Sequence, residues 1–409
     1  MTHLPVAGGR RRARVGVRAA RALVAELARH NGPKTGLLVG VDAHSAALTV
    51  IAEALLPGDT LTVVPGEGTA VAALRDHVAA QGRWVAERVR VVESVAEADP
   101  ADVVVVGEPL TGTADEARTN LDGLAKYLAE GGVLCAASEL AGGAAAELDR
   151  QGALFGVGRD LIVRNTPPLR VHRLRFTPAD AALATRLAPA YRPSSVPVTR
   201  GMHLDSNGVA AAGIALGVAA LTRLARPKSK LWLLPALAAV PVAAFFRDPE
   251  RDVPDDESAV VAASDGKVLS VERLRDDRFG PDEFLRVAVF LSVLDVHVNR
   301  APVAGRVVDY FVTDGGFAAA MKPAAEHNVA AYTVLDTAHG RVVVAQRTGL
   351  IARRIVQRAP MGALLAKGER FGLIRFGSRT DVYLPASAEP LVGPGDRVLG
   401  GSTVIAQLP

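Results

Sequence analysis

Two long stretches without a charged residue interrupt this chain and restrict the folds that it can adopt. Residues 206–222 and 231–246 contain no Asp, Glu, Lys or Arg, and the basic segment 223–230 lies between them. At about 1.5 Å per residue, either stretch would form a helix of roughly 25 Å, slightly short of the ~30 Å hydrocarbon core of a bilayer. We therefore expect an apolar helical hairpin over residues 205–247 that separates two larger domains.

This hairpin could pack in a protein core or against a membrane. Both segments are apolar around the whole helix circumference, and the second contains Pro235 and Pro241. Hydrophobic residues make up 49% of the chain, with a mean hydropathy of +0.21, which is high for a soluble protein. A double crossing would place the basic segment opposite both domains, against the positive-inside bias if those domains are cytosolic. We expect a shallow hairpin with its cations at anionic headgroups, and a buried hairpin is the alternative.

Residues 1–195 alternate short apolar runs with amphipathic stretches. This alternation predicts strands and helices in turn, and therefore a doubly wound α/β domain around a parallel sheet. The expected strands are 36–41, 60–64, 89–92, 102–106 and 132–136, and helical spacing covers 45–55, 69–81 and 116–129.

The first domain resembles a class I S-adenosylmethionine-dependent methyltransferase. Residues 130–134 (Glu-Gly-Gly-Val-Leu) resemble the turn before the fifth strand of that fold, and residues 108–110 (Glu-Pro-Leu) follow the fourth. The resemblance is lost at the cofactor: residues 40–45 lack the glycine-rich turn, and residues 64–66 replace the expected acid, with Glu67 slightly late. We expect a methyltransferase-like domain without activity. The alternative is an active methyltransferase within a bifunctional lipid enzyme.

Residues 248–409 consist of short alternating runs separated by Gly, Pro and Asp. This spacing predicts a β-dominated module, distinct from the first domain. The expected strands include 260–263, 266–271, 285–290, 341–345 and 380–384.

Cysteine usage and charge bear on the location of the chain. The single cysteine, Cys135, excludes an internal disulfide and a Cys-based metal cluster, which fits a reducing cytosol. The basic run 10–14 precedes an amphipathic stretch rather than the apolar core of a signal peptide. We expect both domains on the cytoplasmic face of the cell membrane, held as a peripheral or monotopic protein. Neither nucleic acid nor a metal is an expected partner, and the oligomeric state is left open.

Two motifs in the β-dominated module indicate its chemistry. Residues 375–380 read Arg-Phe-Gly-Ser-Arg-Thr, and residues 295–305 read Asp-Val-His-Val-Asn-Arg-Ala-Pro-Val-Ala-Gly. In order and spacing these motifs resemble a phosphatidylserine decarboxylase of the short bacterial type, and residues 246–251 resemble the junction before its catalytic module. The resemblance implies a membrane-bound lyase that converts phosphatidylserine to phosphatidylethanolamine and CO2.

The resemblance also implies a cofactor that the chain makes from itself. The protein would cleave its Gly377–Ser378 bond into chains 1–377 and 378–409, and Ser378 would become a pyruvoyl group. Decarboxylation of an α-amino acid requires an electron sink, because no ordinary side chain absorbs the electrons left on the α-carbon. Gly377 suits the cleavage, since a residue without Cβ lets the serine hydroxyl approach. The alternative is an ordinary Gly-Ser turn in a non-enzymatic, β-rich membrane scaffold.

Ser402 is a second candidate for the cleaved serine, since Gly-Ser-Thr at 401–403 resembles the cleavage site of the long family type. After its serine, the family has a strand, a loop and a Gly-x-x-Val turn into a final strand. The sequence after Ser378 follows this pattern, with the turn at 395–398, whereas too few residues follow Ser402. We therefore assign the cleavage to Ser378.

Three further residues are assigned by the resemblance. Asp265 would position a base for self-cleavage, although an aspartate before a glycine is also a common turn. His297 would handle a proton during decarboxylation, and Asp295 would share its face if this segment were a strand. Arg300 occupies the position of a second histidine in many long-type relatives and cannot act as a base. The base that activates Ser378 therefore stays open between Asp265 and His297.

Overall fold

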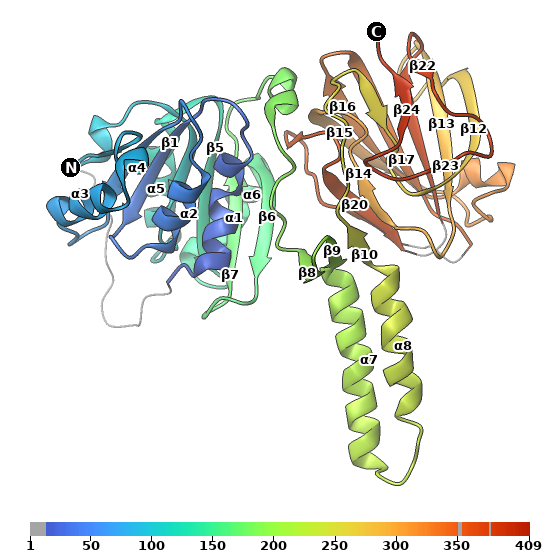
Figure 1. Cartoon of the computed structure of the whole chain (residues 1–409), viewed down its shortest axis with the longest axis horizontal. Helices are drawn as coiled ribbons and strands as arrows, with labels where there is room; N and C mark the ends of the chain where they lie inside the picture. The colour runs from blue at the N-terminus through green and yellow to red at the C-terminus, as the bar shows by residue number, and fades with distance from the viewer. Residues whose placement is uncertain (1–13, 351–353, 376–377) are drawn as a thin grey trace. The chain divides into compact units, whose positions relative to one another are not determined.

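The computed structural model describes residues 14–350, 354–375 and 378–409, which form two compact units. The first unit extends to Pro193 and includes Pro360–Leu364, and the second contains Ser194–Ala359 and Leu365–Pro409. Figure 1 labels many of the elements of both. The apolar hairpin therefore belongs to the same unit as the β-rich module.

A seven-stranded sheet forms the centre of the first unit, in the order β3-β2-β1-β4-β5-β7-β6. β7 runs antiparallel to its neighbours β5 and β6, and the other adjacent strands of this sheet are parallel to one another. The topology confirms the predicted doubly wound α/β class. The strands are β1 (Thr35–Val41), β2 (Thr60–Pro65), β3 (Val89–Val91), β4 (Ala101–Val106), β5 (Leu128–Glu139), β6 (Gly156–Ile162) and β7 (Leu169–Leu174).

Hydrophobic cores lie on both faces of this sheet. On β4, Val103 and Val105 join a cluster with α1, α2 and α3, whereas Val104 and Val106 join a cluster with α5 and α6. Cys135 is buried in the first cluster, and this burial raises the pKa of its thiol to about 12. The helices are α1 (Val17–Ala28), α2 (Ala46–Ala54), α3 (Val71–Ala80), α4 (Arg83–Ala86), α5 (Ala114–Ala125) and α6 (Gly143–Phe155).

The carboxyl ends of β1 and β2 lie directly against one another. Val41 pairs with Pro65, and the Gly66 N–H donates to the Val41 carbonyl oxygen over 2.8 Å. In the following turn, the Asp42 carboxylate accepts from the His44 N–H over 2.8 Å. The N–H groups of Gly66 and His44 are therefore engaged within the chain at the edge where a nucleotide cofactor would approach.

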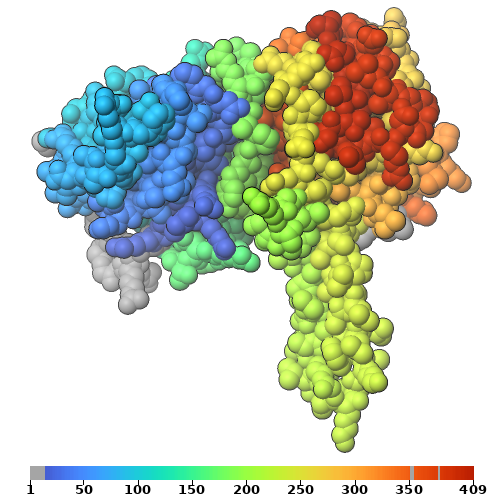
Figure 2. Space-filling model, in the orientation of Figure 1, coloured from blue at the N-terminus to red at the C-terminus, as the bar shows by residue number. Residues whose placement is uncertain are grey.

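Two antiparallel helices, α7 (Ser206–Ala225) and α8 (Leu233–Phe245), confirm the predicted hairpin. Only α7, among the described residues, is long and apolar enough to cross a membrane. α8 is shorter and continues through Pro241, which removes one helical hydrogen bond. Both helices project from the β-rich part of their unit, and no other segment covers their visible faces in Figure 2.

The root of the hairpin is fixed to the rest of the second unit by polar and apolar contacts. Asp205 accepts from the Asn207 N–H over 2.9 Å, which caps α7, and it also receives Arg358 Nη2 at 2.9 Å. A Cβ at Gly208 would lie 2.3 Å from Phe246 Cβ, so the glycine permits close packing of the helices. Strands β8 (Ser195–Thr199), β9 (Met202–Asp205) and β10 (Arg247–Pro249) form a small sheet at this root.

The remainder of the second unit is the predicted β-dominated module. Its eight-stranded sheet has the order β19-β15-β16-β17-β21-β13-β12-β23, and two smaller sheets have the orders β11-β24-β22 and β14-β20-β18. The strands are β11 (Ala259–Val261), β12 (Gly266–Arg275), β13 (Glu283–Leu291), β14 (Val298–Arg300), β15 (Gly305–Thr313), β16 (Ala330–Thr337), β17 (Gly340–Arg347), β18 (Arg354–Gln357), β19 (Leu364–Leu365), β20 (Arg370–Arg375), β21 (Ser378–Pro385), β22 (Glu389–Pro390), β23 (Arg397–Val398) and β24 (Val404–Gln407).

Strand β21 has a central position, paired with β13 on one side and β17 on the other. Because side chains alternate along a strand, Arg379, Asp381 and Tyr383 share one face. Ser378 and Thr380 share the opposite face. These two faces have different chemistry.

Candidate active site at the start of strand β21

Ser378 is the first residue of β21 and lies opposite Leu291 of β13. Its side chain is fully buried, and its Oγ has no hydrogen-bond partner among the described residues. A buried hydroxyl without a partner costs about 1–3 kcal/mol, so such groups are uncommon unless they have a function. Gly377, the other half of the predicted cleavage site, lies outside the described residues. The structure therefore presents the predicted serine as a buried, unbonded nucleophile candidate.

Asp265 lies in the turn before β12 and is held in place by two neighbours. Arg251 Nη2 lies 2.9 and 2.7 Å from its two carboxylate oxygens, and the Gly400 N–H donates to Oδ1 over 2.8 Å. Burial raises the pKa of Asp265, and the nearby Arg251 opposes this effect. The preceding residue, Ser264, shares a 2.6 Å hydrogen bond with Thr380. Asp265 is thus joined, through its neighbour, to the face of β21 that carries Ser378.

His297 lies in the loop before β14, so the expected strand does not include it. Its carbonyl oxygen accepts from the Ile374 N–H, 3.2 Å away on β20, and its ring lies 4.3 Å from that of Phe245. Burial lowers the pKa of His297 to about 4, so the imidazole is neutral at pH 7. Nδ1 lies 2.9 Å from the Asp295 carbonyl oxygen. Since a carbonyl only accepts, we assign the proton to Nδ1, which makes Nε2 the basic nitrogen.

Asp295 shapes the loop that carries His297. Its Oδ2 accepts from both the backbone N–H and the hydroxyl of Ser292 at 2.7 Å, and its Oδ1 pairs with Arg397 at 3.0 Å. Asp295 also lies before β14, so the condition under which it would share a strand face with His297 is not met. The local hydrogen bonds to Ser292 favour a turn over an extended strand.

Arg300 is a buried structural residue. Its guanidinium pairs with Asp248 at 3.0 Å and donates to the carbonyl oxygens of Pro249 and Gly368 at 2.8 and 3.2 Å. Burial lowers the pKa of Arg300 to about 10, which still leaves the guanidinium protonated at neutral pH. This arginine therefore links β10 to β14 and cannot serve as the base for Ser378.

A pair of side-chain amides on the Ser378 side of the eight-stranded sheet was not predicted from the sequence. Gln346 Nε2 donates to Asn299 Oδ1 over 2.6 Å, and both side chains are fully buried. Among the described residues, Asn299 Nδ2 and Gln346 Oε1 have no further partner. Gln346 lies opposite Thr380 in the β17–β21 pairing. Three buried polar atoms without partners, including Ser378 Oγ, therefore belong to the same side of the eight-stranded sheet.

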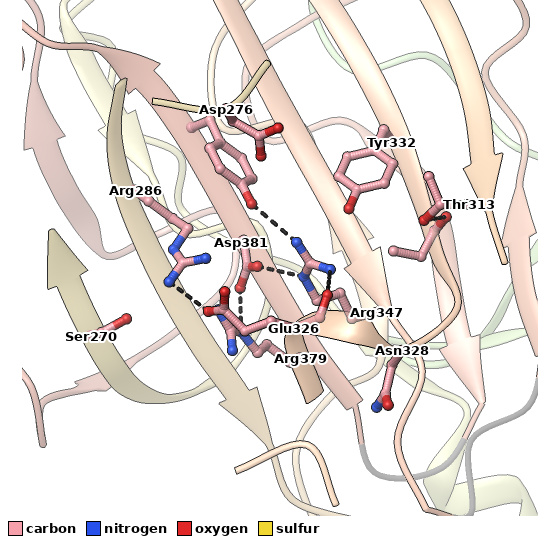
Figure 3. Close-up of polar contacts among 12 residues, drawn as sticks. Ser270, Asp276, Arg286, Thr313, Glu326, Asn328, Tyr332, Arg347, Arg379 and Asp381 are labelled. Atoms are coloured by element: carbon pink, nitrogen blue, oxygen red, sulfur yellow. Dashed lines mark hydrogen bonds and ion pairs between the residues drawn. The ribbon is translucent and has the colours of Figure 1, made fainter. Parts of the chain in front are cut away.

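The opposite face of β21 carries a network of ion pairs, shown in Figure 3. Asp381 accepts from Arg347 Nε at 2.6 Å and from Arg379 Nε at 2.5 Å. Glu326 pairs with Arg379 at 3.1 Å and with Arg286 at 2.7 Å. Although burial opposes the effect, Arg286 and Arg379 lower the pKa of Glu326 to about 2. The network joins β13, β17 and β21, and no local sequence pattern indicated it.

Ser402 has the surroundings of an ordinary turn. Gly401 has a φ of +80°, and the Ser402 N–H donates to the Leu399 carbonyl oxygen over 3.1 Å. Its side chain is half-buried, in contrast to the fully buried Ser378. These features support the choice of Ser378 over Ser402.

Comparisons with known proteins identify the second unit. Residues 240–406 match the family model for phosphatidylserine decarboxylase. The phosphatidylserine decarboxylase proenzyme of Symbiobacterium thermophilum is 51% identical over 167 residues, which cover 40% of this chain and 78% of the relative. The corresponding proenzyme of Geotalea uraniireducens is 46% identical over 167 residues, with the same coverage.

The β-rich fold, the buried serine and these matches define an enzyme module of the decarboxylase class, joined to an α/β domain. The chain belongs to the phosphatidylserine decarboxylase family.

Solved methyltransferase structures resemble the first unit. Precorrin-6y C5,15-methyltransferase from Geobacter metallireducens is 16% identical, covering 39% of this chain and 88% of that protein, with a TM-score of 0.30. A methyltransferase from Pyrococcus furiosus is 14% identical, covering 39% and 83%, with a TM-score of 0.32. The fold class of this unit rests on its own strand order and not on these similarities.

Proposed function

We propose that this protein decarboxylates phosphatidylserine to phosphatidylethanolamine, with a pyruvoyl group that it makes from Ser378. The observation that carries the proposal is the buried Ser378 hydroxyl at the start of a central strand, which has no hydrogen-bond partner among the described residues. Relatives that share 51% and 46% identity are named proenzymes, which supports self-processing.

The processing chemistry starts from the Ser378 hydroxyl. Attack of Oγ on the Gly377 carbonyl carbon forms an ester and breaks the peptide C–N bond. Elimination from this ester releases the Gly377 carboxylate and leaves dehydroalanine at position 378, which water converts to a pyruvoyl group with loss of ammonia. A side chain held by other hydrogen bonds would have to break them before it could attack, and Ser378 Oγ has none among the described residues.

The pyruvoyl group would supply the electron sink for decarboxylation. The substrate amine must lose a proton before it can attack a carbonyl, and the α-carbon must gain one after CO2 leaves. We assign both transfers to His297, which would take the proton at Nε2 and return it. Its lowered pKa of about 4 keeps the imidazole in the accepting form at the outset.

The base for self-processing is assigned to Asp265. Burial raises the pKa of its carboxyl, and Ser264 links its turn to Thr380, two residues from Ser378. The ion pair with Arg251 weakens this base, so His297 is the second candidate. Substitution of each residue distinguishes the two assignments.

The hairpin is assigned as the anchor on the cytoplasmic face of the membrane. Its apolar side chains are exposed, including Ile214, Leu224 and Leu237, and a stable exposed apolar surface of this kind requires a partner. Replacing residues 212–240 with a short Gly-Ser loop keeps the root contacts intact. We expect this variant to become soluble and to retain activity on dispersed short-chain phosphatidylserine. Continued sedimentation with membranes would show that the anchor lies elsewhere.

The first unit is assigned no methyl-transfer activity. The turn after β1 uses its backbone groups internally, and Gly66 donates to Val41 where a cofactor would approach. Titration calorimetry of the full chain with S-adenosylmethionine, which measures binding by residues 1–195, tests this assignment. Saturable binding would favour the bifunctional alternative.

Intact mass is the decisive test of the proposed function. We expect two chains, 1–377 and 378–409, and the small chain has 32 residues (409 − 378 + 1). The small chain should react with hydrazines and resist Edman degradation. A single full-length chain in the mature protein would refute the proposal, and a fragment starting at residue 402 would show that Ser402 is the cleaved serine.

A further inference from the structure

The loop between β13 and β14 carries an exposed apolar tip formed by Val293 and Leu294. Val293 is 49% exposed and Leu294 is 81% exposed, the highest value for a large hydrophobic side chain among the described residues. A single exposed leucine is common on protein surfaces, but neighbouring exposed apolar side chains that lie beside a larger exposed apolar element are typical of an interaction site.

The loop holds this tip in a defined conformation. Asp295 binds both the N–H and the hydroxyl of Ser292, and the Asp295 N–H donates to the Ser292 carbonyl oxygen over 3.0 Å. These three hydrogen bonds close a turn around Val293 and Leu294. The two apolar side chains are therefore displayed by a fixed turn.

The same loop is attached to the root of the hairpin. Arg247 donates from one guanidinium nitrogen to the Leu294 carbonyl oxygen and from another to the Ala244 carbonyl oxygen of α8, at 3.1 Å for the latter. At the other end of the loop, the His297 ring contacts Phe245, the last residue of α8. The apolar tip therefore lies next to the root of the hairpin.

We propose that Val293 and Leu294 insert into the surface of the bilayer beside the hairpin and form a second membrane contact. This inference rests on the proposed membrane role of the hairpin. Insertion at two points would fix the orientation of the module and bring the loop that carries His297 to the headgroup layer. The guanidinium of Arg247, located between the tip and α8, would lie at the level of the lipid phosphates.

Tryptophan insertion tests this contact directly. The experiment uses a Trp232→Phe background, because Trp232 lies in the hairpin, and compares Leu294→Trp with Leu391→Trp. Leu391 is 53% exposed and directly follows β22. Figure 1 shows β22 at the end of the module away from the hairpin. Vesicles of phosphatidylglycerol and phosphatidylcholine carry bromine on their acyl chains. Trp84, in the first unit, is present in both variants and cancels in the comparison.

We expect a blue shift and quenching by brominated lipid for Trp at position 294, and neither change at position 391. Equal behaviour of the two variants would overturn the proposal. A blue shift at position 294 that appears without vesicles and increases with protein concentration would also overturn the proposal. A second copy of the chain would then cover the tip.

Activity provides the second test. The double variant Val293→Ser, Leu294→Ser removes the apolar tip and keeps the Asp295 hydrogen bonds. We expect the ratio of activity on vesicles to activity on dispersed short-chain phosphatidylserine to fall about tenfold or more, because insertion of even one leucine-sized side chain contributes roughly a factor of ten to partitioning. An unchanged ratio would contradict the proposal. A wild-type protein without decarboxylase activity would instead refute the proposed function, and the fluorescence result would remain interpretable.

Discussion

The two faces of strand β21 are both polar and buried, yet their polar groups differ in hydrogen bonding. On one face, Asp381 binds two guanidinium groups, and Arg379 also binds Glu326. On the other face, the Ser378 hydroxyl has no partner among the described residues. Paired charges hold the strand in place, whereas a hydroxyl without a hydrogen-bond partner is available for reaction. The comparison suggests that one face provides rigidity and the other provides chemistry.

Removing the unpaired hydroxyl should have the largest effect. We expect Ser378→Ala to remain a single chain of 42.6 kDa without detectable decarboxylation, because the nucleophile and the precursor of the cofactor are both lost. Mass spectrometry and CO2 release measure the outcome. The matched control, Ser402→Ala, should process normally. If Ser378→Ala were still cleaved, the reactive face would have been misidentified.

Substitution of the two base candidates separates processing from catalysis. We expect His297→Gln to process and then lose about 10²- to 10⁴-fold in kcat, the usual contribution of proton transfer, while Asp265→Asn mainly blocks cleavage. Hydrazine labelling of the small chain quantifies processing independently of turnover. His339→Ala is the control, since His339 contacts the Pro409 carbonyl oxygen at the end of the chain. Normal kcat in processed His297→Gln would contradict the assignment.

Removing ion pairs from the face of β21 that carries Asp381 should affect stability more than catalysis. In the Ser378→Ala background, which keeps the chain intact, we expect Asp381→Asn to lower the free energy of unfolding by about 3–5 kcal/mol, because the buried Arg347 loses its counterion and Arg379 keeps only Glu326. Urea denaturation followed by circular dichroism measures this loss. Glu272→Gln, which removes a half-exposed partner of Arg286, should cost less than about 1 kcal/mol. Similar costs for the two variants would argue against a special role of the buried network.

The pH dependence of stability tests the environment of His297. Its pKa of about 4 in the folded state lies below the ordinary 6.5, so the unfolded state binds more protons between these values and stability falls as the pH falls through this window. Between pH 7 and pH 5, Ser378→Ala should lose about 2 kcal/mol more than Ser378→Ala with His297→Gln. The difference also removes the contribution of His172, whose pKa burial likewise lowers to about 4. Equal losses would place His297 in a solvated environment.

The local periodicity of apolar and polar residues was sufficient to predict the fold class of each unit. The apolar runs at 36–41 and 102–106 became β1 and β4, and the charge-free stretches became the hairpin, because these patterns report burial of neighbouring residues. Strands β6 and β7 were not predicted, since their residues alternate weakly and depend on antiparallel pairing with β5.

The site was predictable only in part. Ser378, Asp265 and His297 were found through motifs, whereas the Asn299–Gln346 pair joins residues 47 apart in the sequence and depends on packing between two sheets. Whether Asp295 and His297 lie in a strand was left open by the sequence, and the hydrogen bonds that Asp295 accepts from Ser292 stabilise a turn there. Alternation of polar and apolar residues does not reveal such long-range or side-chain contacts.

The central position of β21 has a consequence for the protein after cleavage. The fragment 378–409 would contain β21 to β24, and these strands pair with β13, β17, β12 and β11 of the larger fragment. The mature enzyme would thus be a complex of two complementing fragments, with the reactive group at the buried amino terminus of the smaller one. Separating the fragments would require the sheet to open, so exchange of the small fragment should be slow. Refolding after denaturation would become bimolecular, and recovery should depend on protein concentration.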